Sequence, residues 1–386
     1  MTTLLLSAGD ASGELHTAAF VEAFRRRVPG AQLLGLGGSE MEKVGVELVV
    51  HQRDLAVGAL GVLGDLGRIF SAWRRMNRAL QTSGADLVVL VDSPDFNIPL
   101  ARRAKKAGIP VLYFISPQVW AWRRRRIGKI ERRVDRMAVI FPFEKDVYAA
   151  SRLQVDFVGH PLVDRLGEVA LRSSPQEMRR SLGIDPGGFL VVLLPGSRRN
   201  EVRDGLSLQL EAARALHARD ARARFAVAVA PSISRASVER AIAEARLPSL
   251  LSIRVFEGCA YQLIRAADVA LAKPGTVTVE IALLGTPMVV AFRASSLTAF
   301  LARRVIRVPS FAMPNLIVGA PVVPEFLQEE ARPERIALAL AELLEGPARE
   351  LQLAHLARVR QRLGSGGAAE RAAAIAEEMA CGAGGA

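Results

Sequence analysis

The fold is decided by the stretch Ala85–Asn97, which reads ADLVVLVDSPDFN. Its segment Leu87–Val91 is an unbroken apolar run of residues that favour strands, which is typical of a strand buried on both faces of a parallel sheet. Pro94 ends this strand, and we expect Asn97 to cap a helix over Ile98–Ala107. The stretch therefore predicts an open α/β fold built on parallel strands.

Two carboxylates, Asp92 and Asp95, follow this strand directly. Open α/β sheets form their ligand crevice at the carboxyl ends of the strands, so both residues are placed where a substrate would bind. For either residue alone, capping a turn is the better explanation. A second polar constellation later in the chain, suited to a nucleotide, favours a catalytic role.

Composition limits the class of protein. A chain of 386 residues, half of them hydrophobic, is expected to form about two globular domains. The two cysteines, Cys259 and Cys381, are far apart and indicate a reducing compartment without a disulfide framework. We interpret the start of the chain as a first strand and not a signal peptide, and no apolar run approaches the roughly 18 residues of a membrane span.

The chain is strongly basic, with 51 Lys and Arg against 39 Asp and Glu and a net charge of +12. This balance suggests nucleic acid, an anionic membrane surface or phosphorylated substrates, although solvated arginine-rich helix faces would explain it equally. Trp120 and Trp122 precede a predicted basic helix over 123–136, a combination that suits a membrane interface or ordinary packing. The apolar, glycine-rich segment Leu55–Phe70 is a predicted core helix, with a lipid-facing segment as the alternative.

Two turns in the first half point to the same sheet edge. A predicted strand over Thr2–Ser7 leads into Gly9-Asp10-Ala11-Ser12-Gly13-Glu14, which opens a helix and offers backbone N–H groups to polar or anionic ligands. His160 lies in a Gly-His-Pro turn and is more often a structural hydrogen-bonding residue than a base. Further strands are expected at Gln32–Leu36, Pro110–Ile115, Met137–Phe141 and Val155–Val158.

The second half repeats the pattern after a polar linker region, Asp164–Pro186. A buried strand over Phe189–Leu194 ends in a turn that contains Gly196, Ser197 and Arg198 before the next helix. Backbone N–H groups at a helix N-terminus beside a cation suit a phosphate, although the Walker lysine is absent and this turn alone is a weak signal.

The strongest local motif is a strand over Asp268–Ala272, a turn, and a helix over Val277–Leu284. Gly275 and Thr276 would offer N–H and hydroxyl groups to a phosphate, and Glu280 would accept hydrogen bonds from a ribose diol. A glutamate that only balances the helix dipole is the alternative. The remaining strands are expected at Arg224–Ala230, Ser252–Phe256 and Pro287–Phe292, and helical stretches at Pro333–Leu344 and Ala348–Met379.

Several motifs together resemble one family. They are AGDASGE, VDSPDFN, ISPQVWAWRRRRIGKI, FPFEKDVY, VGHP, LLPGSR followed by EV, GTVTVE, and PNLIVG with VPEFLQ. In this combination the chain resembles the lipid-A-disaccharide synthase family of bacterial glycosyltransferases over nearly its whole length.

The resemblance implies a fold and a reaction. The fold is α/β, with two Rossmann-like domains facing across a cleft (the GT-B architecture) and C-terminal helices that pack back on the N-terminal domain. Expected boundaries are 1–166 for the acceptor domain, 167–345 for the UDP-sugar domain and 346–386 for the C-terminal helices. The reaction transfers 2,3-diacylglucosamine from UDP to 2,3-diacylglucosamine 1-phosphate, giving a β-1,6 disaccharide and UDP, with inversion and without a metal or other cofactor.

The resemblance also implies site residues. The family's catalytic aspartate falls on Asp95 and its arginine on Arg198. The predicted nucleotide-binding residues are Gly196, Ser197, Arg198, Gly258, Gly275, Thr276, Glu280, Asn315 and Gln328. The predicted acceptor or loop residues are Gly9, Ser12, Glu14, Asn97 and His160. The predicted membrane residues are Leu60, Val62, Leu63, Trp120, Trp122, Arg124, Arg125 and Arg126.

The chain departs from the family pattern at four places. The first glycine turn has Asp10 before Glu14, where the family has the reverse order. Gly61 stands where the family carries a glutamate, Pro274 replaces a serine, and Ser295-Ser296 replaces a Lys-Pro pair. The first departure keeps the charge and alters its reach, the second removes any role of that glutamate, and the third removes one hydroxyl near the phosphates.

The resemblance implies partners and a location. We expect UDP-linked and phosphorylated acylated glucosamine lipids, an anionic membrane surface and no nucleic acid, and both a monomer and a homodimer stay open. The expected location is the cytoplasm, peripheral on the inner face of the bacterial inner membrane. A related UDP-GlcNAc transferase or 2-epimerase of GT-B architecture is the alternative, and a basic nucleic-acid-binding protein is a third hypothesis.

Overall fold

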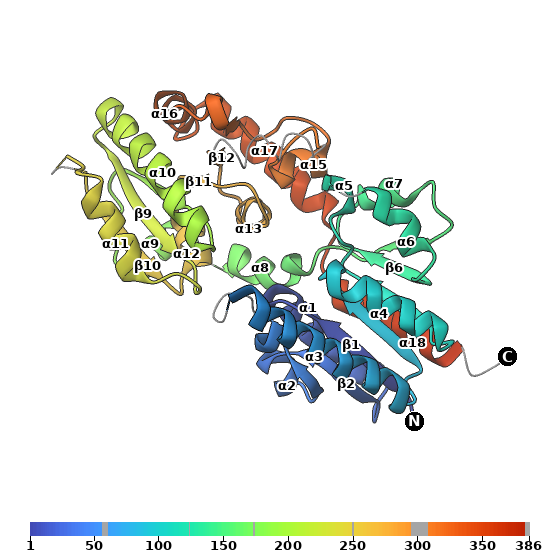
Figure 1. Ribbon diagram of the computed structural model, residues 1–386. Coiled ribbons are helices and arrows are strands. Elements are labelled where there is room, and N and C mark those ends of the chain that lie inside the picture. Colours follow the sequence, from blue (N-terminus) through green and yellow to red (C-terminus); the bar gives the residue numbers. More distant parts are fainter. Residues whose placement is uncertain (56–60, 123, 173, 249–250, 295–307, 383–386) are drawn as a thin grey trace. The chain divides into compact units, whose positions relative to one another are not determined.

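The computed structural model describes residues 1–55, 61–122, 124–172, 174–248, 251–294 and 308–382 (Figure 1). The chain forms two compact units. Unit 1 comprises Met1–Pro161 and Gly366–Ala386, and unit 2 comprises Leu162–Ser365. Each unit has its own parallel sheet, in agreement with the predicted α/β fold.

Unit 1 contains a seven-stranded sheet in the order β3-β2-β1-β4-β5-β6-β7, in which every pairing is parallel. Its strands are β1 (Thr3–Ala8), β2 (Gln32–Gly37), β3 (Glu47–His51), β4 (Leu87–Val91), β5 (Val111–Phe114), β6 (Arg136–Val139) and β7 (Gln154–Phe157). All five residues of β4 are buried because neighbouring strands and helices cover both their edges and their faces, as the apolar run predicts.

Helices cover this sheet. They are α1 (Ala11–Arg27), α2 (Ser39–Lys43), α3 (Gly61–Thr82), α4 (Pro94–Lys106), α5 (Val119–Trp122), α6 (Ile127–Glu131), α7 (Glu144–Tyr148) and α18 (Ala368–Gly382), with 3-10 turns η1 (Gln52–Leu55) and η2 (Arg124–Arg126). The terminal helix α18 packs against α1, and an ion pair of 2.7 Å joins Arg27 to Glu377 across that contact. Helices α3 and α4 pack together and contribute Met76 and Ile98 to one apolar core.

Unit 2 contains a six-stranded parallel sheet in the order β10-β9-β8-β11-β12-β13. Its strands are β8 (Phe189–Leu194), β9 (Ala223–Val229), β10 (Ile253–Glu257), β11 (Val269–Ala272), β12 (Met288–Phe292) and β13 (Glu325–Leu327). Strands β8 and β11 form the middle of this sheet. Both strands are buried, from Leu190 to Leu194 and from Val269 to Ala272.

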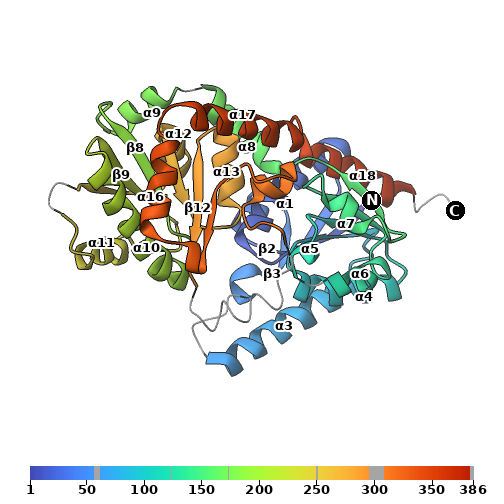
Figure 2. The ribbon, with the colours of Figure 1, turned by 90° about the horizontal axis from the view of Figure 1, so that it is seen from above.

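The helices of unit 2 are α8 (Pro161–Arg172), α9 (Pro175–Ser181), α10 (Arg199–Arg219), α11 (Arg235–Glu244), α12 (Ala260–Ala266), α13 (Val277–Leu284), α15 (Met313–Val318), α16 (Pro333–Glu342) and α17 (Pro347–Arg362), with a 3-10 turn η3 (Gln328–Glu330). Helices α10, α11 and α16 pack in one layer, and α9, α12, α13 and α17 form another (Figure 2). Unit 2 therefore has the helix–sheet–helix layers of a doubly wound domain.

Both sheets have a point where the strand order reverses. In unit 1 the chain moves outward from β1 through β2 to β3 and then returns to place β4 on the other side of β1. In unit 2 it moves from β8 through β9 to β10 and returns to place β11 beside β8. The loops after these paired strands diverge and leave a crevice for ligands. We call the two places the unit 1 switch point and the unit 2 switch point.

Several sequence predictions of local structure are wrong. Helix α4 begins at Pro94, so Asn97 lies inside the helix and does not cap it. The predicted basic helix over 123–136 is a 3-10 turn, the short helix α6 and the start of β6. The supposed linker region contains α9 and most of α8, and strands β3 and β13 were not predicted.

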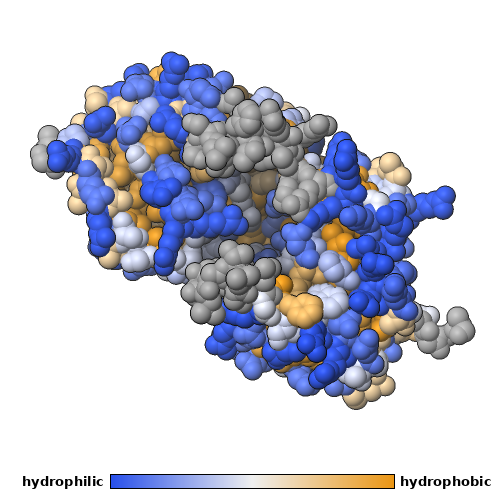
Figure 3. All heavy atoms as spheres, viewed as in Figure 1, coloured by the Kyte–Doolittle hydropathy of each residue, from blue (hydrophilic) through white to orange (hydrophobic). Residues whose placement is uncertain are grey.

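The C-terminal helices divide between the units. The stretch predicted as one helix from Ala348 to Met379 forms α17, which packs on α13 and α15 in unit 2, and α18, which packs on unit 1. Only α18 therefore packs back on the N-terminal unit as predicted. Among the described helices, none has the length and apolar character needed to cross a membrane. Hydrophilic residues cover most of the face seen in Figure 3, with separate hydrophobic patches between them.

Candidate active site

The unit 1 switch point holds strained backbone. Asp92 and Ser93, just after β4, have φ angles of 43° and 41°, and Ile115, just after β5, has a φ angle of 65°. Such left-handed conformations cost about 1–3 kcal/mol each in residues other than glycine, and they concentrate at functional sites. The Asp92 N–H donates to the Ile115 carbonyl at 3.3 Å, so the strained segments support each other.

The turn after β1 faces this strained segment. A Cβ atom at Gly9 would lie 2.6 Å from the Ser93 Oγ atom, so only glycine allows the two loops to approach this closely. Asp10 caps α1, because its carboxylate accepts from the Gly13 N–H at 2.7 Å. The turn therefore brings a second carboxylate to the unit 1 switch point.

The surroundings of Asp92 raise the pKa of its carboxyl group. Burial, and then the negative charge of Asp10, raise the pKa of Asp92 to about 6. The hydroxyl of Tyr113, a residue of β5, donates to the Asp92 carbonyl oxygen. A largely buried carboxylate with a pKa near neutrality is suited to accept a proton.

Asn97 holds the Asp92 backbone in place. Its side-chain amide donates to the carbonyl oxygens of Val91 at 3.0 Å and Asp92 at 2.9 Å, and its oxygen accepts from the Ser7 hydroxyl at 2.6 Å. Asn97 is fully buried. It therefore ties the ends of β1 and β4 to α4 and is a positioning residue.

Asp95, the predicted catalytic aspartate, has a different environment. It lies in the first turn of α4, its side chain is 75% exposed, and it forms an ion pair with Arg126. Arg126, a predicted membrane residue, pairs with Asp95, and its side chain is 20% exposed. It adds a positive charge at the edge of the unit 1 switch point.

Two other predicted acceptor residues, Glu14 and His160, are buried and contact other parts of unit 1. Glu14 is buried and accepts from the Glu40 N–H at 2.6 Å and from the Gln52 side-chain amide. His160 is buried, with its ring centroid 5.0 Å from that of Phe141, and burial lowers its pKa to about 3. Ser12 is exposed, and its hydroxyl lies 3.4 Å from the His16 Nε2 atom.

The predicted membrane residues divide into three groups. Trp120 is buried and meets Phe143 edge-on at 5.2 Å, so its prediction as a lipid-contacting residue is wrong. Arg124 and Arg125 are exposed, as that role requires. Leu60 and the side chains of Val62, Leu63 and Trp122 lie outside the described residues. On the described part of α3, Phe70 is 60% exposed, with the Arg74 guanidinium 6.0 Å from its ring centre.

The unit 2 switch point is built on an ion pair that the sequence did not indicate. Lys273, just after β11, donates to Glu201 of α10 at 2.9 Å. The second Glu201 oxygen accepts from the N–H groups of Ser197 and Arg198, each at 3.3 Å. Burial opposes ionisation of Glu201, but the hydrogen bond and charge of Lys273 outweigh it and lower the pKa of the carboxyl group. Ser197 and Arg198 thus lie in the predicted turn, and their backbone N–H groups donate to Glu201.

The N-terminus of α13 has free space in front of it. Gly275 has a φ angle of 139°, and apart from its chain neighbours no described residue has an atom within 4 Å of the position of an added Cβ atom. Thr276 is exposed, and no side chain caps the helix. Thr278 supports the turn, because its hydroxyl donates to the Gly275 carbonyl at 2.7 Å. A helix N-terminus of this kind is a suitable site for phosphate.

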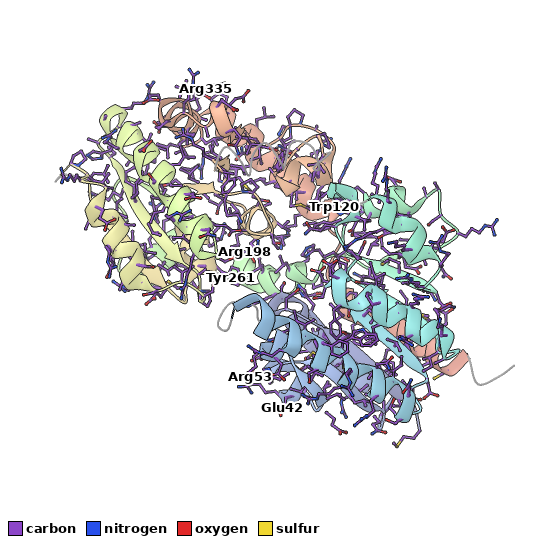
Figure 4. All side chains as sticks on the ribbon, in the orientation of Figure 1. Glu42, Arg53, Trp120, Arg198, Tyr261 and Arg335 are labelled. Atoms are coloured by element: carbon purple, nitrogen blue, oxygen red, sulfur yellow. The ribbon has the colours of Figure 1, made fainter. Side chains whose placement is uncertain are left out.

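Glu280 of α13 lies in a small cluster with Tyr261 of α12 and Arg165 of α8. Its carboxylate accepts from the Tyr261 hydroxyl at 3.4 Å, and burial raises its pKa. The Arg165 guanidinium lies 5.3 Å from the centre of the Tyr261 ring. Figure 4 labels Arg198 and Tyr261, which stand where α10 and α12 begin.

The other predicted nucleotide residues lie in loops. Asn315 is buried, and its amide group bonds to the backbone of Val322 and Val323 and to Glu325, so its donors and acceptor serve its own loop. A direct nucleotide contact by Asn315 therefore does not fit this geometry. Gly258 follows β10 with a φ angle of 72°, and Gln328 follows β13 with a φ angle of 53°, which places both at the ligand edge of the sheet.

Comparison with known proteins identifies the family. Residues 4–379 match the lipid-A-disaccharide synthetase family. The chain is 42% identical to the lipid-A-disaccharide synthase of Geobacter metallireducens over 378 residues, which cover 97% of each chain. The chain belongs to the lipid-A-disaccharide synthase family. It is a glycosyltransferase of lipid A biosynthesis, as the sequence motifs indicate.

A second relative supports this family, and two solved structures share the fold. The lipid-A-disaccharide synthase of Syntrophus aciditrophicus is 42% identical, over 97% of this chain and 96% of its own. The UDP-GlcNAc 2-epimerase of Neisseria meningitidis, bound to UDP-GlcNAc, has a TM-score of 0.63 at 12% identity and covers 99% and 100% of the two chains. MurG of Acinetobacter baumannii has a TM-score of 0.61 at 15% identity, with 98% and 99% covered. The chain therefore shares the predicted GT-B fold with these proteins.

Sequence reasoning missed three residues near the unit 2 switch point of this lipid-A-disaccharide synthase family member. They are Glu201, Tyr261 and Lys273. Arg126 was predicted as a membrane residue and not as the partner of Asp95. Lys273 and Glu201 each flank a predicted phosphate turn, which was the only available signal. The departures at Gly61 and Pro274 lie at the starts of α3 and α13, and Ser295-Ser296 lies outside the described residues.

Proposed function

We propose that this chain transfers 2,3-diacylglucosamine from UDP to the 6-hydroxyl of 2,3-diacylglucosamine 1-phosphate, and that each switch point supplies one part of the chemistry. The observation that carries this proposal is the contrast in charge between them. Unit 1 presents a carboxylate with a pKa of about 6, and unit 2 presents the exposed Arg198 guanidinium and the N-terminus of α13.

In this proposal Asp92 is the general base. The acceptor oxygen attacks C1 of the donor sugar, its proton passes to the Asp92 carboxylate, and the bond from C1 to the UDP oxygen breaks with inversion at C1. General-base assistance of this kind contributes about 10²–10⁴-fold. The sequence placed the base at Asp95, but the exposure of Asp95 and its ion pair with Arg126 favour Asp92.

Unit 2 would bind UDP and stabilise it as it leaves. The departing diphosphate takes the electron pair of the broken bond, and the N-terminus of α13 and the Arg198 guanidinium offset this charge. Glu280 would accept the ribose hydroxyls, with Tyr261 orienting its carboxylate. Because these groups supply positive charge, the proposal includes no metal ion, and we expect EDTA to leave the rate unchanged. Within the described parts of the chain, no three His, Cys, Asp or Glu residues are grouped as metal ligands.

One assay tests the proposal. The purified chain is incubated with UDP-2,3-diacylglucosamine and 2,3-diacylglucosamine 1-phosphate, and UDP and the disaccharide are measured together. We expect equal amounts of both products, and none when either substrate is omitted. UDP-GlcNAc without acyl chains is the control for the alternative. Conversion of that compound to its 2-epimer, with no disaccharide from the acylated pair, would contradict the proposal.

We also propose that unit 1 binds an anionic membrane surface peripherally. The exposed Phe70 beside Arg74 and the exposed Arg124 and Arg125 support this, since apolar burial and cationic attraction both favour such a surface. Vesicles containing anionic lipid should bind the chain, and changing Arg124 and Arg125 to Ser should remove the salt-sensitive part of that binding. Changing Phe70 to Ser should remove part of the salt-resistant remainder. Wild-type binding by both folded variants would place the membrane surface elsewhere.

A further inference from the structure

The ion pair between Glu201 and Lys273 has no role in the proposed reaction, yet it lies at the unit 2 switch point. The Lys273 Nζ atom is 2.9 Å from the Glu201 Oε1 atom, and the side chains are 20% and 16% exposed. Lys273 follows β11 and lies two residues before Gly275, in the turn that leads to α13. Glu201 lies in the first turn of α10. The pair thus bridges the two loops that would hold a diphosphate.

The turn after β8 is shaped around this pair. Gly196 has a φ angle of 130°, and an added Cβ atom there would lie 2.8 Å from Glu201 Oε2 and 2.9 Å from Lys273 Cδ. Any other residue would therefore push against both partners as well as strain the backbone. The glycine of this motif allows the two side chains to meet over the turn.

Glu201 also decides which helix end is available to a ligand. Its Oε2 atom accepts from the N–H groups of Ser197 and Arg198, so the N-terminus of α10 is occupied by a carboxylate of the same chain. Among the described residues, no side chain caps α13, and none outside the adjacent turn comes within 4 Å of a Cβ atom added at Gly275. An anion that reaches this edge therefore has α13, not α10, as its open donor group.

A carboxylate at this position creates an electrostatic problem. An unpaired Glu201 would repel a diphosphate bound at the neighbouring turn, because like charges separated by a few ångströms disfavour each other strongly when they are partly shielded from water. Lys273 is the cation in contact with Glu201 on that side, since Arg198 reaches it only at 3.5 Å and its side chain is 84% exposed.

We propose that Lys273 acts on UDP binding through Glu201: it neutralises the carboxylate that closes the α10 N-terminus, so that the diphosphate binds at α13 with the Arg198 guanidinium free to approach it. Lys273 and Glu201 are then positioning residues, and neither is a direct phosphate ligand. This inference rests on the proposed function of unit 2 as the UDP site.

A double-mutant cycle separates this role from direct phosphate binding by Lys273. UDP dissociation constants are measured by calorimetry for the wild type, Lys273→Met, Glu201→Gln and the double variant. We expect Lys273→Met to weaken UDP binding about tenfold when Glu201 is present and less than about twofold when residue 201 is glutamine. A similar loss in both backgrounds means that Lys273 contacts the phosphate itself and overturns the inference, as does the absence of a loss in either background.

A further variant and a salt series test whether the charge of Lys273 is what matters. Lys273→Arg keeps the charge and should keep UDP affinity within about threefold of the wild type, whereas a loss as large as that of Lys273→Met counts against neutralisation. The weakening caused by Lys273→Met should diminish as salt is raised, which a purely structural defect would not do. UDP that fails to bind the wild type overturns the proposed function together with this inference. UDP that binds, with no coupling between the two sites, overturns this inference alone.

Discussion

The two switch points share a topology but differ in how they make room for a ligand. In unit 1 the segment after the central strand is strained in residues with side chains, Asp92 and Ser93. In unit 2 the corresponding turns have their positive φ angles at Gly196 and Gly275. Strain at a side-chain-bearing residue aims a carboxylate, whereas glycine leaves the backbone N–H groups accessible to an anion.

The charges differ in the same sense. In unit 1, burial and then the neighbouring Asp10 carboxylate raise the pKa of Asp92. In unit 2 the carboxylate of Glu201 is matched by Lys273, which leaves Arg198 as an exposed cation. One fold can thus hold a base at one reversal of strand order and an anion site at another, because the loops and not the sheet determine the chemistry.

The largest expected effect concerns the base. Asp92→Asn keeps the size of the side chain but cannot accept a proton, so kcat should fall by about 10²–10⁴-fold while the UDP dissociation constant changes little. Asp95→Asn is the matched control and should lower kcat by less than about tenfold. A larger loss in Asp95→Asn than in Asp92→Asn would return the role of base to Asp95.

The next effect concerns the nucleotide side. Glu280→Gln should weaken UDP binding by roughly 1.5–3 kcal/mol, because a carboxylate accepts hydrogen bonds from a ribose diol more strongly than an amide does. Tyr261→Phe keeps the ring and removes only the hydroxyl that bonds to Glu280, so it should have a smaller effect. Unchanged UDP affinity in a folded Glu280→Gln variant would assign Glu280 to the helix dipole alone.

The pH dependence sharpens the contrast between the units. The base must be ionised to act, and the pKa of Asp92 is about 6, so kcat/KM should be constant above that pH and fall below it. At pH 5 the rate should be about tenfold below its plateau, since the ionised fraction falls tenfold for each unit below the pKa. An acid limb in kcat/KM that survives in Asp92→Asn would falsify the assignment.

The smallest effect concerns the glycine of the first turn. Gly9→Ala places a methyl group 2.6 Å from the Ser93 Oγ atom, and the resulting overpacking should cost about 1–3 kcal/mol in the free energy of unfolding. Combining it with Ser93→Ala removes the clashing oxygen and should recover part of that loss, as measured by chemical denaturation. At Gly275, where the backbone and not a contact requires glycine, no neighbouring truncation should rescue an alanine.

Much of the fold followed from local pattern. The buried runs at β4 and β8 and the helix α13 have the predicted bounds, because residues buried on both faces leave a continuous apolar signal. Strands β3 and β13 escaped prediction because they are edge strands with charged or mixed sequences, ELVVH and EFL, whose strand geometry depends on pairing with a neighbour. Asn97 was misplaced because an asparagine after a proline looks like a cap until its buried partners in β1 and β4 are known.

The sequence by itself determined the fold class, the family and the turns that carry the candidate site, since these depend on residues adjacent along the chain. Only the tertiary structure decided that the pKa of Asp92 is raised, because this pKa is set by burial and by Asp10, 82 positions away in the printed sequence. The same holds for the pairing of Arg126 with Asp95 and of Lys273 with Glu201. Electrostatic interaction depends on distance in space, and folding alone sets that distance for residues far apart in the chain.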